Sequence, residues 1–555
     1  MLKDGQLYIA HSENGNINLI GKMANRHGLI AGATGTGKTV TLQVLAETFS
    51  QAGVPCFMAD MKGDLSGISQ PGRLSGFIEK RMPEFGIENP QFAGCPTRFF
   101  DVFGEQGFPM RATVSAMGPQ LLARLMELTE VQAGVLNAVF RIADDNNLLL
   151  IDLKDLKLML DFVGKNAAKF TTEYGNIAPA SIGAIQRSVL QIESEGGDKF
   201  FGEPAFEVED LFAVENGRGV MNVLAADKLM LNPKLYSTYL LWLITELYAK
   251  LPEVGDLELP IFVFFFDEAH MLFDGTSKAL VNKIEQVIRL IRSKGVGIYF
   301  ITQVPSDVPV NVLAQLSNRV QHALRAYTPQ DQKAVRAAAE TFRTNPAFKT
   351  EDAILDLGTG EALVSFLDEK GAPSVVERAK ILFPLSQIGA ITPGQRLDIQ
   401  AAAPDRLKDY EKFFDRESAY EVLTEANEKA EKQKEKEAKA AEKEKEKKAK
   451  EKEKKSSSKS KKGGIGRTIF GTMIAAAATS FARSAGTSIA KSIGSSKSKK
   501  STSSSKKTTT TKKSGTSTKS SSGSILGDAV KKATKTAANT ATRKVTTEIL
   551  KSIFS

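Results

Sequence analysis

The sequence predicts an α/β fold with a mainly parallel sheet, followed by a low-complexity C-terminal tail. In residues 1–404, short runs of β-branched and aromatic residues alternate with longer segments of helical periodicity. This alternation is typical of parallel strands connected by helices. Near residue 405 the composition changes, and Lys, Glu, Ser and Thr replace most of the apolar residues. We therefore expect one α/β domain over residues 1–404 and a different kind of structure after it.

Six segments of unbroken apolar character are candidate strands, and this character predicts that both faces of each strand are buried. They cover residues 27–31, 54–59, 219–225, 260–266, 297–302 and 318–324. Between about 65 and 215 the periodicity becomes helical, as in "VSAMGPQLLARLMELTEVQAGVLNAVFRIA". This stretch is too long for a simple crossover between strands. It predicts a helical insertion in the α/β domain.

The C-terminal part divides into a charged segment and a basic tail. In residues 405–455, Glu and Lys spaced four apart favour a solvent-exposed helix, but each pair contributes only about 0.3 kcal/mol, so disorder competes. Residues 456–555 contain tracts of Ser, Thr, Lys and Gly, which are typical of flexible linkers. Two short amphipathic segments, 466–494 and 525–554, interrupt these tracts. Such segments form helices that bind a membrane surface or a partner helix.

The charge is distributed unevenly along the chain. The net charge is +10, but residues 421–555 carry 33 Lys and Arg against 13 Asp and Glu, whereas residues 1–420 carry 41 against 51. A basic tail on an acidic body indicates an anionic partner, either nucleic acid or a membrane surface. The alternative is a solvated extension without a partner.

Cysteine usage and hydropathy indicate a cytoplasmic protein. Cys56 and Cys95 are far apart in the sequence and do not form a CxxC pair, and the chain has four histidines. We therefore expect neither a disulfide framework nor a structural zinc site. The first residues lack the apolar core of a signal peptide, and no segment reaches the roughly 20 apolar residues of a membrane span.

The stretch "GATGTGKT" matches the phosphate-binding pattern G-x-x-x-x-G-K-[ST] between a candidate strand and an amphipathic helix. Its glycines allow backbone N–H groups to surround phosphates at a helix N-terminus. Lys38 would neutralise the β- and γ-phosphates of ATP, and the Thr39 hydroxyl would bind Mg²⁺. The residues predicted to bind ATP are Gly32, Ala33, Thr34, Gly35, Thr36, Gly37, Lys38 and Thr39.

A second motif, "IFVFFFDEAH", supplies the carboxylates that such a site requires. Asp267 follows an apolar strand and would bind the Mg²⁺ ion, while Glu268 would polarise the attacking water. The alternative is that both acids cap the following helix. "DEAH" also occurs in helicases with two RecA-like halves, but the chain after residue 303 offers no second half of that size.

Other polar residues near strand ends are further candidates. Gln303 follows the strand "GIYFIT", where its amide could sense the γ-phosphate, and Arg292 precedes the same strand on an expected subunit edge. Arg319 is a second candidate for an arginine that acts on a neighbouring subunit. Asp60 and Lys62 follow the second candidate strand, where an ordinary turn is an equally good interpretation.

Five motifs occur in an order that resembles the HerA/FtsK group of ring-forming motors. They are "HGLIAGATGTGKT", "ADMKGD", "FFFDEAHMLF", "IRSKGVGIYFITQVPSDVP" and "LSNRVQHALRAYTPQDQKAV". The resemblance covers about residues 1–400 and is greatest to the bacterial HerA-like helicase C-terminal (YjgR-like) family. It implies a RecA-like P-loop core, a homohexameric ring and ATP sites shared between neighbours.

The resemblance also implies roles for individual residues. Lys38 and Thr39 match the Walker A pair, Asp267 and Glu268 match the Walker B pair, Gln303 matches the sensor amide, and Arg292 matches the arginine that acts in trans. Only about 26 residues precede the strand that leads into the P-loop, and we expect these to be too few for the N-terminal barrel of archaeal HerA proteins.

These observations lead to three hypotheses about function. The first is an ATP-driven motor, a translocase or helicase, that acts on double-stranded DNA and grips phosphates without reading bases. The second is a membrane-associated secretion or conjugation ATPase that moves protein and uses the tail as its membrane contact. The third is a nucleotide-gated scaffold with slow turnover.

Overall fold

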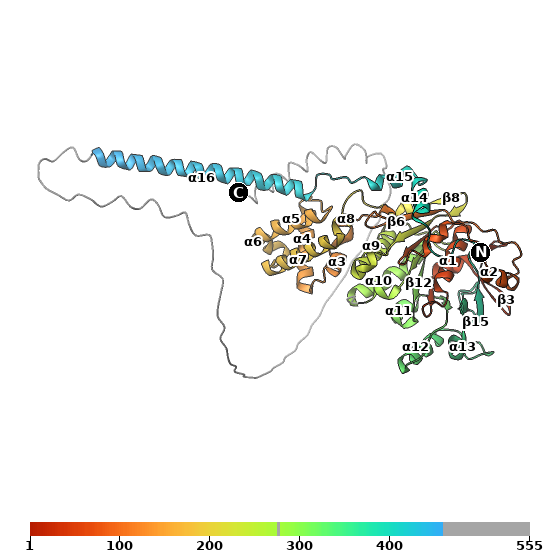
Figure 1. The fold of residues 1–555 in the computed structure, drawn as a ribbon. Coiled ribbons are helices and arrows are strands. Elements are labelled where there is room, and N and C mark those ends of the chain that lie inside the picture. The colour runs from red at the N-terminus through yellow and green to blue at the C-terminus, as the bar shows by residue number, and fades with distance from the viewer. Residues whose placement is uncertain (275–277, 459–555) are drawn as a thin grey trace, which may run out of the picture. The chain divides into compact units, whose positions relative to one another are not determined.

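The computed structural model describes residues 1–274 and 278–458. The predicted amphipathic segments 466–494 and 525–554 lie outside the described residues. By its internal contacts the chain divides into two units, residues 1–428 and 429–555. The first unit contains one large mixed sheet, and Figure 1 shows its helices on both sides of the strands.

The centre of the sheet consists of six neighbouring parallel strands, and each corresponds to one of the six predicted strands. Their spatial order is β13-β4-β12-β11-β5-β10. Their bounds are β4 (Gly28–Ala31), β5 (Cys56–Asp60), β10 (Met221–Ala225), β11 (Phe262–Phe266), β12 (Val296–Thr302) and β13 (Asn318–Gln321). The predicted α/β fold with a mainly parallel sheet is confirmed.

The edges of the sheet differ from its centre. Beyond β10, the sheet continues in parallel with β6 (Thr97–Asp101) and β7 (Phe108–Pro109). Beyond β13, the strands are antiparallel: β14 (Glu361–Ser365), β15 (Glu377–Ile381), β2 (Gln6–Ser12), β1 (Leu2–Lys3) and β3 (Gly15–Leu19). A separate hairpin joins β8 (Val214–Glu215) to β9 (Arg218–Gly219).

One large hydrophobic cluster lies between the sheet and α1 (Lys38–Gln51). The α1 side chains of Leu42, Leu45 and Phe49 pack in one cluster with Phe265 of β11 and Tyr299 of β12. Helices α9 (Pro233–Lys250) and α10 (Lys278–Ile291) contact each other, and α10 also contacts β12. A smaller cluster joins β14 to α12 (Pro329–Ala339) and α13 (Thr350–Asp356), and the short α11 (Val310–Leu313) follows β12.

The predicted insertion contains a group of helices that packs against α9 through α3. The helices between residues 65 and 215 are α2 (Gly76–Arg81), α3 (Val114–Leu125), α4 (Glu130–Asp145), α5 (Leu153–Lys165), α6 (Ala167–Tyr174), α7 (Pro179–Ile192) and α8 (Asp198–Phe200). The same range also contributes β6 and β7 to the sheet, so its purely helical part begins later than the sequence predicted. In Figure 1, α3 to α7 form a distinct group beside the strands.

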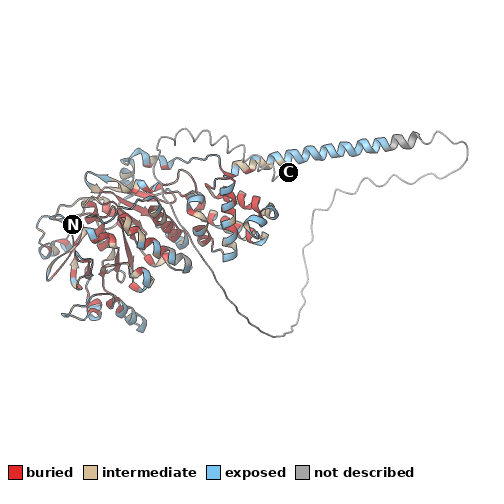
Figure 2. Cartoon of the chain, turned by 180° about the vertical axis from the view of Figure 1, so that it is seen from behind, coloured by how far each residue is buried: buried red, intermediate tan, exposed pale blue. Residues whose placement is uncertain are grey.

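After β15 the chain forms α14 (Pro393–Ala401), α15 (Asp405–Lys408) and α16 (Ala419–Ser458). Residues 405–423 pack against the rest of the first unit, since the side chains of Leu407, Tyr410, Ala419 and Leu423 are buried. The first unit therefore extends past the predicted boundary at residue 404. Most of α16 is exposed along its length (Figure 2). Within the described ranges, we find no helix with the length and apolar character needed to cross a membrane.

Candidate nucleotide site

The predicted phosphate-binding loop connects β4 to α1 at the carboxyl edge of the parallel strands. Gly35 and Gly37 adopt left-handed backbone conformations, with φ of 80° and 117°, which favour glycine. A Cβ atom at Gly32 would lie 2.5 Å from Cβ of His322, so a side chain would clash there. The Thr36 hydroxyl donates to the Ala33 carbonyl over 2.7 Å. The loop therefore has the conformation that leaves the N-terminus of α1 open to an anion.

Lys38 is the first residue of α1, and its ammonium turns back over the loop. It donates to the carbonyls of Gly32 and Ala33 over 2.6 Å and 3.2 Å. Burial lowers the pKa of Lys38, whereas the carboxylates of Glu268 and Asp267 raise it. Because both carboxylates act on the pKa of Lys38, its ammonium lies within electrostatic range of Asp267 and Glu268. Thr39 follows in the same helical turn, as its predicted role in Mg²⁺ binding requires.

Asp267 and Glu268 follow β11, which is separated from the loop strand β4 by β12. This is the strand arrangement of a RecA-like P-loop core, as predicted. Burial raises the pKa of Asp267 to about 6, and the neighbouring Glu268 carboxylate acts in the same direction. The backbone N–H of Glu268 donates to Oδ1 of Asp267 over 2.9 Å. Both acids therefore lie at the same sheet edge as Lys38.

Glu268 has two features that are uncommon for a surface carboxylate. Its backbone is left-handed, with φ of 46°, a conformation that costs free energy for a residue other than glycine. Its Oε2 atom is buried and makes no hydrogen bond within the described residues. Nδ1 of the His270 imidazole lies 3.5 Å from this atom. The Glu268 carboxylate is therefore held at the site without being fully satisfied by the protein.

Gln303 lies directly beside the loop. It follows the last residue of β12, and its backbone carbonyl accepts a hydrogen bond from the Gly32 N–H over 3.1 Å. The Gln303 side chain is exposed. Its position fits the predicted sensor amide, next to the phosphate-binding loop.

The two candidate arginines have different environments. Arg292 precedes β12 at the amino edge of the parallel strands, and its guanidinium is 3.7 Å from the Asp256 carboxylate. Arg319 donates three hydrogen bonds to the backbone carbonyls of Leu313, Leu316 and Thr341. The guanidinium of Arg319 is thus occupied within its own subunit. These hydrogen bonds favour Arg292 over Arg319 as the candidate for the arginine that reaches a neighbour.

Asp60 and Lys62 lie at the carboxyl end of β5, the neighbour of β11 on the side away from β12. Asp60 is the last residue of β5, and burial raises the pKa of its carboxyl group to about 6. Its Oδ2 atom accepts the Ser66 N–H over 3.0 Å, while Oδ1 is buried without a hydrogen-bond partner among the described residues. The positive charge of Lys62 lowers the pKa of Asp267, so Lys62 lies near the carboxylates.

Some residues that shape the site were not predicted from the sequence. His322 is buried beneath the loop, where Nε2 contacts the Thr41 hydroxyl at 2.8 Å and Nδ1 contacts the Glu361 carbonyl at 2.9 Å. Burial lowers the pKa of His322 to about 4, so the ring is neutral at pH 7. Arg26 lies close enough to Arg292 that its charge lowers the pKa of Arg292. A histidine directly after an apolar strand was the available signal for His322.

The side chains present fit a magnesium–nucleotide complex. Mg²⁺ is usually held by one or two protein oxygens together with substrate phosphates and water. Thr39 and Asp267 would supply these oxygens. In the part of the chain that the structure describes, no cluster of three or more His, Cys, Asp or Glu residues forms a metal site made by protein alone. An ion shared with phosphates is therefore the arrangement that these residues can provide.

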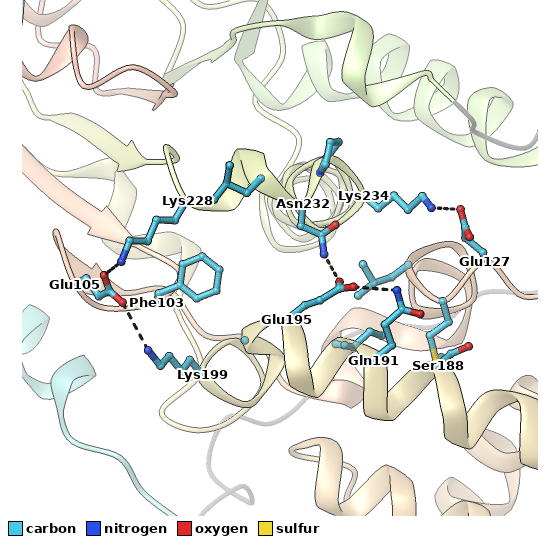
Figure 3. Close-up of a pocket in the computed structure, with 16 residues that line it drawn as sticks. Phe103, Glu105, Glu127, Ser188, Gln191, Glu195, Lys199, Lys228, Asn232 and Lys234 are labelled. Carbon is cyan, nitrogen blue, oxygen red and sulfur yellow. Dashed lines mark hydrogen bonds and ion pairs between the residues drawn. The ribbon is translucent and has the colours of Figure 1, made fainter.

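A separate cavity of about 680 Å³ lies between the helical insertion and the start of α9 (Figure 3). The Glu195 carboxylate on its lining accepts a hydrogen bond from the Gln191 amide over 2.9 Å. Three ion pairs also line the cavity: Glu105 with Lys199, Glu105 with Lys228, and Lys234 with Glu127. These ion pairs are exposed and individually contribute little stability. None of the predicted site residues lines this cavity, so it is distinct from the nucleotide site.

Comparison with known proteins identifies relatives in two groups. The chain is 28% identical over 116 residues to the DNA double-strand break repair helicase HerA of Sulfolobus acidocaldarius, a match that covers 21% of this chain and 22% of that protein. The match thus spans about a fifth of that relative's length. The family model described as "Helicase HerA-like C-terminal" matches residues 6–500.

Solved structures with a similar fold include those of the bacterial conjugative coupling protein TrwB and of VirB4. The conjugative coupling protein TrwB is 15% identical in its unbound form, with a TM-score of 0.45 over 71% of this chain and 92% of that chain. Its complex with ADP and Mg²⁺ is 16% identical, with a TM-score of 0.44 over 67% and 88%. VirB4 of Thermoanaerobacter pseudethanolicus is 15% identical, with a TM-score of 0.45 over 68% and 97%.

Proposed function

The chain belongs to the HerA-like helicase C-terminal family, and from this premise we propose that it is an ATP-hydrolysing ring motor that acts on double-stranded DNA. One observation carries the hydrolytic part of the proposal: Lys38, Asp267 and Glu268 meet at one edge of the sheet, beside a glycine-rich loop. The combination of a cation, a metal-binding acid and a second acid is what hydrolysis of a triphosphate requires.

Each of these residues has a distinct task in hydrolysis. The loop amides and Lys38 bind the phosphates, and Lys38 exchanges its carbonyl partners for phosphate oxygens. The unsatisfied Glu268 carboxylate orients the attacking water and accepts its proton. The exposed Gln303 amide positions the same water or contacts the γ-phosphate. When bound through Thr39 and Asp267, Mg²⁺ neutralises charge that develops on the phosphates.

The ring part of the proposal rests on the position of Arg292. The nucleotide loop lies at the carboxyl edge of the parallel strands, whereas Arg292 precedes β12 at the amino edge. One subunit therefore cannot bring its own Arg292 to its own triphosphate. In a head-to-tail assembly, the arginine of one subunit meets the loop of the next, and such interfaces close into rings. We propose a homohexamer, as in the family that the motifs resemble.

The DNA part of the proposal is supported by family membership and by the positive charge of the C-terminal tail. The acidic balance of residues 1–420 confines attractive contacts with phosphate to local basic groups or to the basic tail. Phosphate contacts of this kind do not depend on base sequence, which suits a protein that moves along a duplex.

The first test measures ATP hydrolysis with and without duplex DNA. We expect Lys38→Ala to abolish hydrolysis, because the phosphates lose their main cation, and duplex DNA at low salt to raise wild-type turnover. Lys349→Ala, which changes an exposed lysine away from the site, is the matched control and should hydrolyse ATP normally. A wild-type rate that duplex DNA does not change at low salt would contradict the DNA part of the proposal.

Liposome flotation, DNA binding and ATP hydrolysis together separate the proposal from its alternatives. Liposome flotation of the full chain and of a chain truncated after residue 458 tests the tail, since this truncation leaves every described residue in place. Tail-dependent flotation without DNA binding would instead favour a membrane-associated ATPase that moves protein. Negligible hydrolysis with an intact Glu268 would favour a nucleotide-gated scaffold.

A further inference from the structure

The orientation of a bound triphosphate follows from the positions of the acids. Asp267, Glu268 and Gln303 lie on the side of β4 occupied by β12 and β11, so the γ-phosphate points to that side. The opposite neighbours of β4 are β13 and then β14. A triphosphate that runs along the loop therefore directs its nucleoside toward the start of β14.

The loop that precedes β14 touches the phosphate-binding loop. The Gly360 N–H donates to the Thr36 carbonyl over 3.0 Å. A Cβ atom at Gly37 would lie only 3.4 Å from Cα of Gly360. The backbone around Gly360 thus lies against the phosphate-binding loop on its nucleoside side.

An arginine from the insertion is fixed on top of this backbone. Arg81 donates to the carbonyls of Thr359 and Ile381 over 3.0 Å and 3.2 Å. A Cβ atom at Gly360 would lie 2.8 Å from the Arg81 guanidinium, so the glycine makes room for it. Burial lowers the pKa of Arg81, but the group stays cationic at pH 7. The guanidinium plane is therefore held in one place beside the nucleotide loop.

The Arg81 guanidinium also stacks on an exposed aromatic ring. Its Cζ atom lies 4.6 Å from the centre of the Phe77 ring, one turn earlier in α2. Phe77 remains 51% exposed. An arginine that covers an aromatic ring is a surface on which nucleobases stack, because each base offers a flat π-face.

We propose that the stacked pair of Phe77 and Arg81 is a nucleoside subsite, on which the base of the bound nucleotide packs. The inference rests on the proposed ATP site and names the residues that hold the other end of the same ligand. Stacking does not read hydrogen bonds, so the subsite favours purine nucleotides by ring area and discriminates weakly between ATP and GTP. Arg81 also links α2 to the backbone just before β14 and at the end of β15. We therefore expect base binding to depend on the position of α2.

The test compares probes with and without a base. Dissociation constants are measured by calorimetry with Mg²⁺ for the β,γ-imido analogue of ATP and for inorganic tripolyphosphate. Aromatic–base stacking is worth about 1–3 kcal/mol, so Phe77→Ala should weaken the analogue by about 5-fold or more. Tripolyphosphate should bind Phe77→Ala as it binds the wild type. Phe77→Trp should restore binding of the analogue.

Leu74→Ala is the matched control, since Leu74 is also 51% exposed and lies just before the same helix. It should leave both dissociation constants unchanged. Unchanged binding of the analogue by Phe77→Ala would overturn the subsite, and so would an equal loss for both probes, which would indicate a general disturbance of the loop. If the wild type binds neither probe, the nucleotide site itself is wrong and the subsite fails with it.

Discussion

Glu268 combines a left-handed backbone with a buried, unpartnered carboxylate oxygen. Strained backbone of this kind persists where the surrounding structure enforces it, and it is concentrated at functional sites. An unsatisfied buried oxygen is costly for stability. Both features make sense if the carboxylate acts on a water molecule brought by the substrate complex.

Substitution of Glu268 by Gln should separate binding from hydrolysis. The amide keeps the shape of the side chain but cannot accept a proton, and general-base catalysis typically contributes about 10²–10⁴ in rate. We therefore expect kcat to fall at least about 100-fold while the dissociation constant for ATP changes little. Glu253→Gln, at an exposed position away from the site, should hydrolyse ATP at the wild-type rate. An undiminished kcat in Glu268→Gln would remove Glu268 from the mechanism.

The two arginines should respond differently to substitution. Arg319→Ala removes donors from three backbone carbonyls, so the free energy of unfolding should fall by about 2 kcal/mol or more. Arg292→Ala should leave stability within about 0.5 kcal/mol, because its ion pair is partly exposed, yet it should abolish hydrolysis. Urea unfolding and ATPase rates of both variants provide the comparison. An Arg319→Ala variant of full stability but no activity would reverse this assignment.

His322 makes stability depend on pH. Its pKa is about 4 in the folded chain and 6.5 when unfolded. Between these values the unfolded chain binds a proton that the native chain does not, so this contribution to stability is full above pH 6.5 and is lost as pH falls toward 4. At pH 5.5 the loss should be about 1.4 kcal/mol.

This loss is measured by urea unfolding at pH 7.5 and at pH 5.5 in the wild type and in His322→Gln. The variant should lose less stability between the two pH values, because glutamine does not titrate. His11→Gln, at a less buried position, is the control. An equal pH dependence in the wild type and His322→Gln would contradict the account of His322.

At the scale of elements, the central strands could be predicted and the edge strands could not. Most of the six predicted strands are largely apolar because both of their faces are buried, and this leaves a clear sequence signal, although β13 reads "NRVQ". The edge strands β14 and β15 mix charged with apolar residues, as in "ERAKI". β15 pairs with β2, which lies more than 300 residues away, and no local pattern records such a partner.

Some residues of the candidate site could likewise be predicted from the sequence and others could not. The loop, the two acids and Gln303 belong to short local motifs, so their positions followed from the sequence. His322, Gly360 and Arg81 reach the site through tertiary contacts, such as the bond from Arg81 to Thr359 across 278 residues. The sequence likewise does not show that three nearby carbonyls accept hydrogen bonds from Arg319.

The connection between α5 and the start of α16 depends on one buried carboxylate, that of Asp155. Asp155 is 0% exposed and accepts the N–H groups of Ile151 and Tyr420 over 2.8 Å and 2.9 Å. Asp155→Ala leaves these donors unpaired, so we expect a loss of about 2–4 kcal/mol in the free energy of unfolding and faster proteolysis near residues 412–418. Asp161→Ala, which breaks an exposed pair with Lys165 in the same helix, should cost under about 0.5 kcal/mol. Equal effects of the two substitutions would contradict this role of Asp155.

At the scale of the whole molecule, the residues proposed for hydrolysis lie at opposite ends of the parallel strands. Lys38 and Glu268 occupy the carboxyl edge, and Arg292 occupies the amino edge. In the proposed head-to-tail assembly, each copy supplies to the next the arginine that its own site lacks. The central claim is therefore that hydrolysis takes place at a joint between two copies of the chain.

Mixing two inactive variants tests this claim most directly. Lys38→Ala subunits keep Arg292 but cannot bind the phosphates, while Arg292→Ala subunits keep the loop but lack the arginine. In mixed assemblies, some joints combine an intact loop with an intact arginine, so ATPase activity should reappear when the two variants are combined. If the mixture remains as inactive as its components, or if either variant alone hydrolyses ATP at the wild-type rate, the site is not shared between subunits through Arg292.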